Sequence, residues 1–236
     1  MKARPFGIIF RRELKALFLT PIAYIVIALF LVVVGWFFFS TFFLAGRADL
    51  RDFFSLLPLI LAFTVPATTM RLFAEERRSG SYEILTTLPV TGVDVLLAKY
   101  ASAVAFTLIA VAPTVSYPLF ISGLGDLDWG PVVGGYLGVL LLALMLCGIG
   151  VLASALTKNQ IVAFIVGLVG CAFFTLIDKM LYFFPAGVGN VLQYLGADYH
   201  FRNASKGMLD SRDVVYFLSM AFLSVFLTHV VNEERR

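Results

Sequence analysis

The chain has 236 residues, of which 60% are hydrophobic and 14% are charged, and its formal net charge is +3. Soluble domains contain about 45–50% apolar and about 25% charged residues, so this composition excludes an ordinary soluble enzyme or nucleic-acid-binding protein. It indicates an integral membrane protein with little chain left for a soluble domain. We therefore expect an all-α, polytopic membrane protein that forms one transmembrane domain over residues 1–236.

The N-terminal arm, at about residues 4–19, has the pattern of an amphipathic helix. Apolar side chains share one face and basic ones the other, namely Phe6, Ile9, Phe10, Leu14 and Leu17 against Arg4, Arg11, Arg12 and Lys15. Such a helix lies in the membrane interface with its basic side toward anionic lipid headgroups. Glu13 interrupts the apolar face. It either snorkels or pairs with a neighbouring arginine, or, in the alternative, contacts a cytoplasmic partner.

Six apolar windows follow the arm, and crossing a bilayer takes roughly 20 mainly apolar residues. The windows lie at about 20–45, 53–70, 98–123, 132–154, 160–178 and 214–231. The first is much longer than the core of a signal peptide, so we expect it to remain as a span. Cys147 and Cys171 both fall inside spans, where small core residues are a better interpretation than a disulfide or a metal pair.

The segment between the second and third windows, RLFAEERRSGSYEILTTLPVT at 71–91, carries six charged residues. Good helix formers continue the second helix through LFAEERR to Ser79 and Gly80, where glycine is a usual terminator. A short helix then has Glu83 in its first turn and ends before Pro89. The segment is therefore predicted to form a kinked elbow.

The elbow is longer than a simple connection between two spans requires. The helix after it begins with a capping box formed by Thr91 and Asp94. The short helix itself presents the apolar residues Ile84, Leu85 and Leu88, which favours a contact with another protein. The alternative is a solvated connector, which explains the arginines but not a capped apolar helix.

The distribution of lysine and arginine predicts the orientation of the chain. Twelve of the 18 basic residues lie in the N-terminal arm, the 71–99 segment, the turn after the fourth span and the C-terminal tail. By the positive-inside rule, these parts and both termini face the cytoplasm. The outer segment at 179–212 carries four of the other six, and it is long enough to weaken the rule.

Few residues are available for chemistry inside the membrane. The interiors of the first five spans hold no ionisable residue, which argues against a proton- or sodium-coupled carrier. His200 and His229 are predicted on opposite sides of the bilayer, so they cannot share a metal. Asp126 and Asp128 read as loop and turn residues beside an interfacial tryptophan. The sequence has no G-x-x-x-x-G-K-[ST] phosphate loop, so we expect neither an enzyme nor a bound cofactor.

Two further patterns concern the later spans. Asp210, Arg212 and Asp213 are interpreted as the start of the last helix, with the acids near its positive dipole end. In the alternative, they gate the outer mouth of a path together with Asp198, His200, Arg202 and Lys206. Close approach of helix backbones is expected at the glycines of spans four and five, which are Gly148, Gly150, Gly167 and Gly170.

Four stretches of the sequence have a recognisable form: RLFAEERRSGSYEILTTLPV with the following VLLAKY, LGDLDWGPVVGGYLG, ASALTKNQIVAF, and HFRNASKGMLDSRDVVYFLSM. They resemble ABC-2 type transporter permeases, in particular the gliding-motility-type subfamily, over most of the chain and in order. The resemblance implies a permease subunit of an ATP-binding-cassette transporter, an exporter in the bacterial inner membrane. It also implies an N-terminal connecting helix and a partly re-entrant outer segment at about 179–212.

The resemblance further implies a coupling segment at about 75–90 that docks on a separate ATPase subunit, which would bind ATP and Mg. The implied docking residues are Glu75, Glu76, Arg77, Arg78, Gly80, Glu83, Ile84 and Leu88, and those of the interface helix are Arg11, Arg12, Glu13 and Lys15. Six spans are few to enclose a path, so we expect a second permease copy, as a homodimer or a closely related heterodimer. Membrane lipid and an extracytoplasmic auxiliary protein are further expected partners. A small secondary carrier or a scaffold subunit of another membrane complex is the alternative.

Overall fold

The computed structural model describes residues 5–45, 49–81, 90–183, 186–208 and 210–234. Over these ranges it contains helices and no strand. The elements are α1 (Pro5–Leu19), α2 (Pro21–Ala45), α3 (Arg51–Thr69), α4 (Arg71–Ser79), α6 (Gly92–Val111), η1 (Ala112–Val115), α7 (Ser116–Ser122), α8 (Trp129–Leu156), α9 (Gln160–Leu176), η2 (Ile177–Phe183), α10 (Ala186–Leu195), α11 (Ala197–Ser205) and α12 (Ser211–Glu234).

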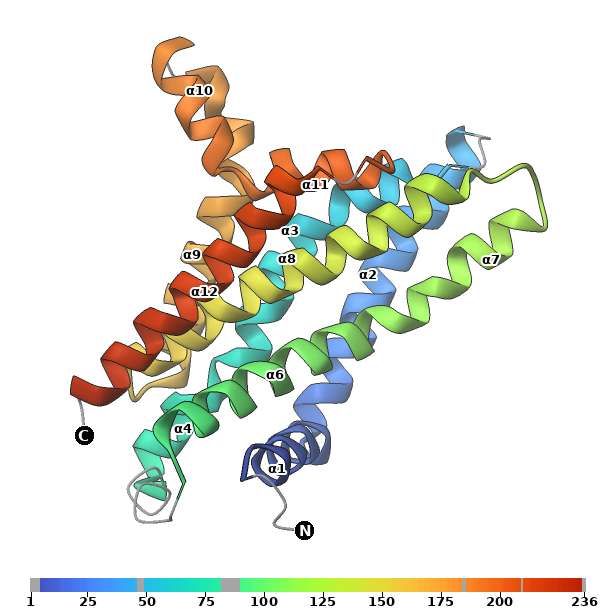
Figure 1. Ribbon diagram of the computed structural model, residues 1–236. Helices are drawn as coiled ribbons and strands as arrows, with labels where there is room; N and C mark the ends of the chain where they lie inside the picture. Colours follow the sequence, from blue (N-terminus) through green and yellow to red (C-terminus); the bar gives the residue numbers. More distant parts are fainter. Residues whose placement is uncertain (1–4, 46–48, 82–89, 184–185, 209, 235–236) are drawn as a thin grey trace.

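Six stretches of helix are long and apolar enough to cross a membrane. They are Pro21–Phe42, Arg51–Ser79, Gly92–Ser122, Trp129–Leu156, Gln160–Met180 and Ser211–Glu234. Each overlaps one of the windows expected from the sequence, and the prediction of an all-α, polytopic membrane protein is confirmed. Figure 1 shows α1, α4 and both chain termini at one end of the bundle, here called the terminal end, and α10 and α11 at the other, the far end.

Several helix boundaries follow from local sequence signals. The Thr91 hydroxyl accepts a hydrogen bond from the Asp94 amide at 3.1 Å, which confirms the predicted start of α6. Asp128 caps α8 in the same way through the Gly130 amide at 3.0 Å, as expected of a turn residue. Pro113 lies in the 3₁₀ segment η1 that separates α6 from α7. Short polar residues and prolines thus divide a mainly apolar chain into elements.

The central helix of the bundle is α8, which α3, α9 and α12 surround (Figure 1). In its spanning window 72% of the residues are buried, against 22% in α2 and in α12. Its glycines permit this, because a Cβ atom at Gly150 would lie 2.2 Å from the Thr69 hydroxyl, and one at Gly148 would lie 3.0 Å from Ser224. The expected close approach at these two glycines is confirmed. The cysteines, Cys147 and Cys171, are free and buried in the same region.

The segment before α12 forms η2, α10 and α11. Of these, α11 packs against α8 and α3, with Phe201 fully buried, while α10 points away from the bundle (Figure 1). The predicted helix start at 210–213 is confirmed, since α12 begins at Ser211 and has Asp213 in its first turn. Non-spanning helices thus lie at both ends of the bundle, α1 at the terminal end and α10 and α11 at the far end.

Candidate functional site

The short helix α4 continues the second spanning helix beyond the break at Met70 and lies at the terminal end of the bundle (Figure 1). It ends at Gly80, whose φ of 74° is the left-handed conformation that favours glycine. The predicted extension and its glycine terminator are both confirmed. The expected short helix with Glu83, Ile84 and Leu88 lies outside the described residues.

A buried lysine joins α4 to two other helices. The ammonium of Lys99, in α6, lies 2.8 Å from a carboxylate oxygen of Glu76 in α4 and 3.0 Å from one of Glu13 in α1. Its side chain has no exposed surface and lies over the Phe73 ring, 5.4 Å from the ring centroid. Arg12, on α1, contacts the same carboxylates at 2.5 Å and 3.5 Å. These four charged side chains are called the Lys99 cluster below.

The ionisation of Glu13 follows from this environment. Burial disfavours the carboxylate, but the positive charges and hydrogen bonds of Lys99 and Arg12 prevail and lower the pKa of Glu13 below its usual value. Pairing with a neighbouring arginine was the simpler interpretation of Glu13, and it is confirmed. The second partner of Glu13, Lys99, was not expected. The sequence groups Lys99 with the connecting segment, whereas in the structure it lies two turns into α6.

A serine from the central helix contacts the backbone at the start of α4. The Ser154 hydroxyl, in α8, accepts hydrogen bonds from the amides of Phe73 at 3.0 Å and Ala74 at 3.1 Å. It donates to the carbonyl oxygen of Met70 at 2.9 Å. Ser154 has no exposed surface, so these backbone groups are satisfied without water.

An arginine completes the junction by connecting α4 to α8 and α12. The guanidinium of Arg77 donates to the carbonyl oxygen of Ala155, at the end of α8, at 2.6 Å, and to the side-chain oxygen of Asn232, in α12, at 2.5 Å. Polar contacts therefore tie α4 to α1, α6, α8 and α12. We call this set of contacts the α4 junction. Its hydrogen bonds and ion pairs attach α4 to the neighbouring helices.

A comparison with protein families identifies the chain. The model of the family described as ABC-2 family transporter protein matches residues 45–191. The chain belongs to the ABC-2 transporter family. It is therefore a membrane permease of an ATP-binding-cassette transporter, a multi-pass component that is not itself catalytic and that works with an ATPase subunit. No curated protein matches the chain.

The other residues assigned to the docking set lie around the permease's α4 junction. Glu75 pairs with Arg71 one turn earlier at 2.8 Å, and Arg78 is exposed. On α1, Arg11 and Lys15 are also exposed. Three members of the set expected to dock on an ATPase, Glu75, Glu76 and Arg77, thus make contacts within the chain.

Sequence reasoning missed three members of the junction: Lys99, Ser154 and Asn232. Lys99 carried a signal, because a lysine at the edge of an apolar window is expensive to bury unless it is paired. Ser154 and Asn232 carried none, since small or polar residues near the end of a span are common in any membrane helix. The family match includes Lys99 and Ser154 but neither Glu13 nor Asn232.

At the far end, the permease holds a second polar cluster, between α11 and its neighbours. Arg202 pairs with Asp178 and lies 3.8 Å from Asp198, which Lys179 approaches to 3.7 Å. Burial raises the pKa of Asp198 above its usual value, although Lys179 opposes the shift. These four residues are called the Asp198 cluster below.

Beside the Asp198 cluster, a buried histidine connects α11 to α12. The two ring nitrogens of His200 lie 2.6 Å from the Asp213 carboxylate and 3.0 Å from the carbonyl oxygen of Tyr194. Its ring stacks on Tyr216 with the centroids 4.1 Å apart. Of the residues proposed as an outer gate, the structure thus brings together Asp198 and Arg202, and separately His200 and Asp213.

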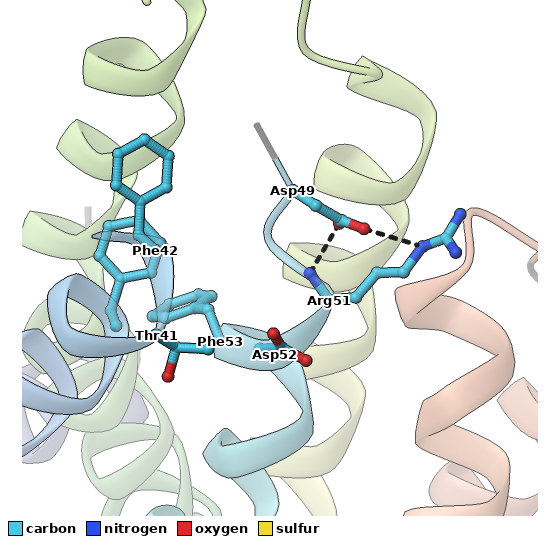
Figure 2. Close-up of a pocket in the computed structure, with 7 residues that line it drawn as sticks. Thr41, Phe42, Asp49, Arg51, Asp52 and Phe53 are labelled. Carbon is cyan, nitrogen blue, oxygen red and sulfur yellow. Dashed lines mark hydrogen bonds and ion pairs between the residues drawn. The ribbon is translucent and has the colours of Figure 1, made fainter. Parts of the chain in front are cut away.

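A hollow of about 440 Å³ opens at the far end between α2 and α3. Figure 2 shows phenylalanine rings on one side of it and charged side chains on the other, where Arg51 pairs with Asp49 at 3.5 Å. The lining residues are Phe38, Thr41, Phe42, Asp49, Arg51, Asp52 and Phe53. Among the described residues no group of three or more His, Cys, Asp or Glu side chains could hold a metal ion.

Proposed function

We propose that this permease is the transmembrane subunit of an exporter, driven by a separate cytoplasmic ATPase that docks on residues 75–90. The observation that carries the proposal is the Lys99 cluster. It attaches the helix next to the predicted docking segment to two other helices through a fully buried ammonium group. A movement of the docking segment would then move α1, α4 and α6 together.

The energetics of buried charges support this role. Removing one partner of a buried ion pair typically costs about 3–5 kcal/mol, because the other charge is left desolvated and unpaired. Separating the Lys99 ammonium from Glu13 and Glu76 would therefore cost much free energy, because the buried charges would lose their partners. Arg77 adds an attachment of α4 to α8 and α12. The ATPase would thus act on a short helix that contacts four others.

The basic residues support the orientation. The positive-inside count puts residues 71–91 and both termini in the cytoplasm, and α1, α4 and the termini do lie at one end of the bundle (Figure 1). ATP and Mg would bind to the ATPase, since the chain contains no phosphate loop. We propose the bacterial inner membrane, the gliding-motility-type subfamily and an extracytoplasmic auxiliary protein on the resemblance of the four stretches quoted above.

The number of spans supports a transport path formed by two permease copies. Six spans, with α8 at their centre, are few to enclose a path, so we propose a dimer of this chain or of this chain with a close relative. Export is the proposed direction, because charged side chains are rare in the spans and this favours cargo taken up from the membrane.

Docking is tested by changing the elbow without touching a span. We expect Glu83→Ala with Leu88→Ser to leave membrane insertion and thermal stability nearly intact. It should reduce co-purification of the ATPase at least tenfold and abolish stimulation of its ATP hydrolysis by cargo. The reason is that a charge-assisted hydrogen bond and an apolar contact to the ATPase are both removed.

The matched control is Glu233→Ala with Glu234→Ala, which removes two acidic side chains from the end of α12 at the same end of the bundle. This variant should keep the ATPase. If it loses the ATPase while the elbow variant retains it, the elbow is a plain connector and the proposal is wrong.

A further inference from the structure

The second spanning helix changes its hydrogen bonding in one place. Residues 51–79 form one candidate span, but the helix is interrupted at Met70. Met70 has a ψ of −26°, a value typical of a 3₁₀ helix. In an unbroken α-helix the Phe73 amide donates to the carbonyl oxygen of Thr69, whereas here the Ser154 hydroxyl accepts from it at 3.0 Å. A side chain inserted into the helical hydrogen bonds is one of the known causes of a kink.

The sequence just before Met70 weakens the regular helix. Pro66 has no amide hydrogen to donate. The hydroxyls of Thr68 and Thr69 both donate back to the carbonyl oxygen of Val65, at 2.8 Å and 2.9 Å, and such bonds bend helices. Gly150, one turn before Ser154 in α8, leaves the space that Thr69 occupies. The position of the break is therefore set by both helices.

We propose that Ser154 is a positioning residue that holds the second spanning helix in a bent state, and that Met70 is the hinge on which α4 moves when the ATPase acts. The inference rests on the proposed function for its purpose, but the hinge itself is a property of this chain alone. Ser154 contacts neither cargo nor ATPase in this scheme. It acts through the direction of α4.

The polar groups around Met70 can find hydrogen-bond partners in two states of the helix. In the bent state, Ser154 makes three bonds, to the amides of Phe73 and Ala74 and to the carbonyl of Met70. In a straight state, the two amides would donate to the carbonyls four residues earlier, and the Ser154 hydroxyl would donate to the carbonyl of Gly150 in its own helix. The Phe73 amide and the Ser154 hydroxyl thus each have a partner in both states. A ligand that binds one state more tightly can shift such an equilibrium by the difference between its affinities for the two states.

A purely structural role predicts something different. If Ser154 only satisfied buried backbone groups, its removal would leave the Phe73 amide without its partner and would leave the direction of α4 unchanged. Ser102 provides the matched comparison. It is also fully buried, but its hydroxyl donates to the carbonyl oxygen of Lys99 in its own helix, at 2.7 Å.

The test measures where the end of α4 lies. Spin labels are placed at Ser79 and Lys158, which are both exposed at the terminal end, in a chain with Cys147→Ala and Cys171→Ala, and their separation is measured in lipid nanodiscs. A nine-residue helix is about 14 Å long, so a change in direction of about 20° moves its tip by about 5 Å. We expect Ser154→Ala to shift the main label separation by about this amount.

Two further variants make the result specific. Ser102→Ala and Ser154→Thr, which keeps the hydroxyl, should both retain the wild-type separation. Ser154→Gly removes the same hydroxyl and replaces the alanine variant if that variant does not fold. An unchanged separation in the variants without the Ser154 hydroxyl, or the same shift in Ser154→Thr, would overturn the hinge.

A second arm connects the hinge to transport. In the complex with the co-purified ATPase, ATP with vanadate should move the wild-type labels toward the separation seen in Ser154→Ala, and should no longer move them in that variant. A wild-type separation that ATP and vanadate leave unchanged would overturn the proposed use of the hinge. If no ATPase co-purifies with the wild-type chain, the proposed function fails, while the nanodisc measurement still decides on the hinge.

Discussion

The two ends of the bundle each fasten a non-spanning helix with a polar cluster, but only the cluster at the terminal end contains a fully buried cation. In the Lys99 cluster the cation is at the centre, with 0% of its side chain exposed, and two carboxylates converge on it. In the Asp198 cluster the carboxylates of Asp178 and Asp198 are 5% and 6% exposed, whereas the cations Lys179 and Arg202 are about half exposed.

The difference concerns what happens when a member is lost. An exposed cation can be replaced by water and salt, because solvent screens its partner. A buried cation cannot, because its two carboxylates are left desolvated. The terminal end therefore depends mainly on Lys99, because Arg12, which contacts the same two carboxylates, is about half exposed, whereas both cations of the far end are about half exposed. A buried cation suits a site that transmits movement between helices, because the Lys99 Nζ atom of α6 contacts both α1 and α4.

The largest expected effect is that of Lys99→Met, which keeps the length of the side chain and removes its charge. We expect the free energy of unfolding in nanodiscs to fall by about 3–5 kcal/mol, as for other broken buried pairs. Thermal or denaturant unfolding of the purified permease measures it. Lys158→Met, which changes an exposed lysine at the same end, should have almost no effect.

A triple variant checks the cause of that loss. Adding Glu13→Gln and Glu76→Gln to Lys99→Met removes the unpaired charges and should restore most of the lost stability. A single variant as stable as the wild type, or a triple variant no better than the single one, would show that the Lys99 cluster is not a desolvated centre.

A smaller effect distinguishes the two ends by pH. The pKa of Glu13 is lowered by its cations, so its ionisation stabilises the fold, fully above the unfolded value of 4.5 and less as the pH falls through the folded pKa. The pKa of Asp198 is raised by burial, so its ionisation destabilises the fold as the pH rises from 3.8 through the folded pKa.

Unfolding measured between pH 3 and 6 should show the two opposite signs. As the pH rises, the wild type should gain stability relative to Glu13→Gln and lose stability relative to Asp198→Asn. If both differences change in the same direction, the contrast between the two clusters is wrong.

The smallest effect is expected at the exposed cations of the far end. Arg202→Gln and Lys179→Gln should each reduce stability by less than about 1 kcal/mol, because partly exposed ion pairs contribute little. The loss should shrink further in high salt, whereas that of Lys99→Met should not. If Arg202→Gln lost as much stability as Lys99→Met, and salt did not change that loss, the proposed difference between the two clusters would be wrong.

Local patterns in the sequence predict the elements well. The amphipathic period of α1, the capping box at Thr91 and the glycine at position 80 each depend on residues within a few positions of one another, and all three appear in the structure. The same holds for the apolar windows, because a span is defined by its own length and composition.

The contacts of the α4 junction could not be predicted in this way. Glu13 and Lys99 are 86 residues apart in the sequence, and no local pattern around either residue predicts its contact with the other. Ser154 looks like any small residue in a packed span. Even the break at Met70, which Pro66 and the neighbouring threonines prepare, becomes visible only when α8 supplies the hydroxyl. What the sequence leaves open is which distant helices meet.

These long separations also determine when the junction can form during synthesis. Phe73 and Ser154 are 81 residues apart, and Arg77 and Asn232 are 155 residues apart. At about 5–20 residues per second, the ribosome needs roughly 8–30 s to proceed from Arg77 to Asn232. During this interval α4 has already left the ribosome but lacks its partners in α8 and α12. The surface proposed to receive the ATPase is thus completed only after all six candidate spans have been made. An ATPase that binds earlier would bind α4 before its contacts with α8 and α12 have formed.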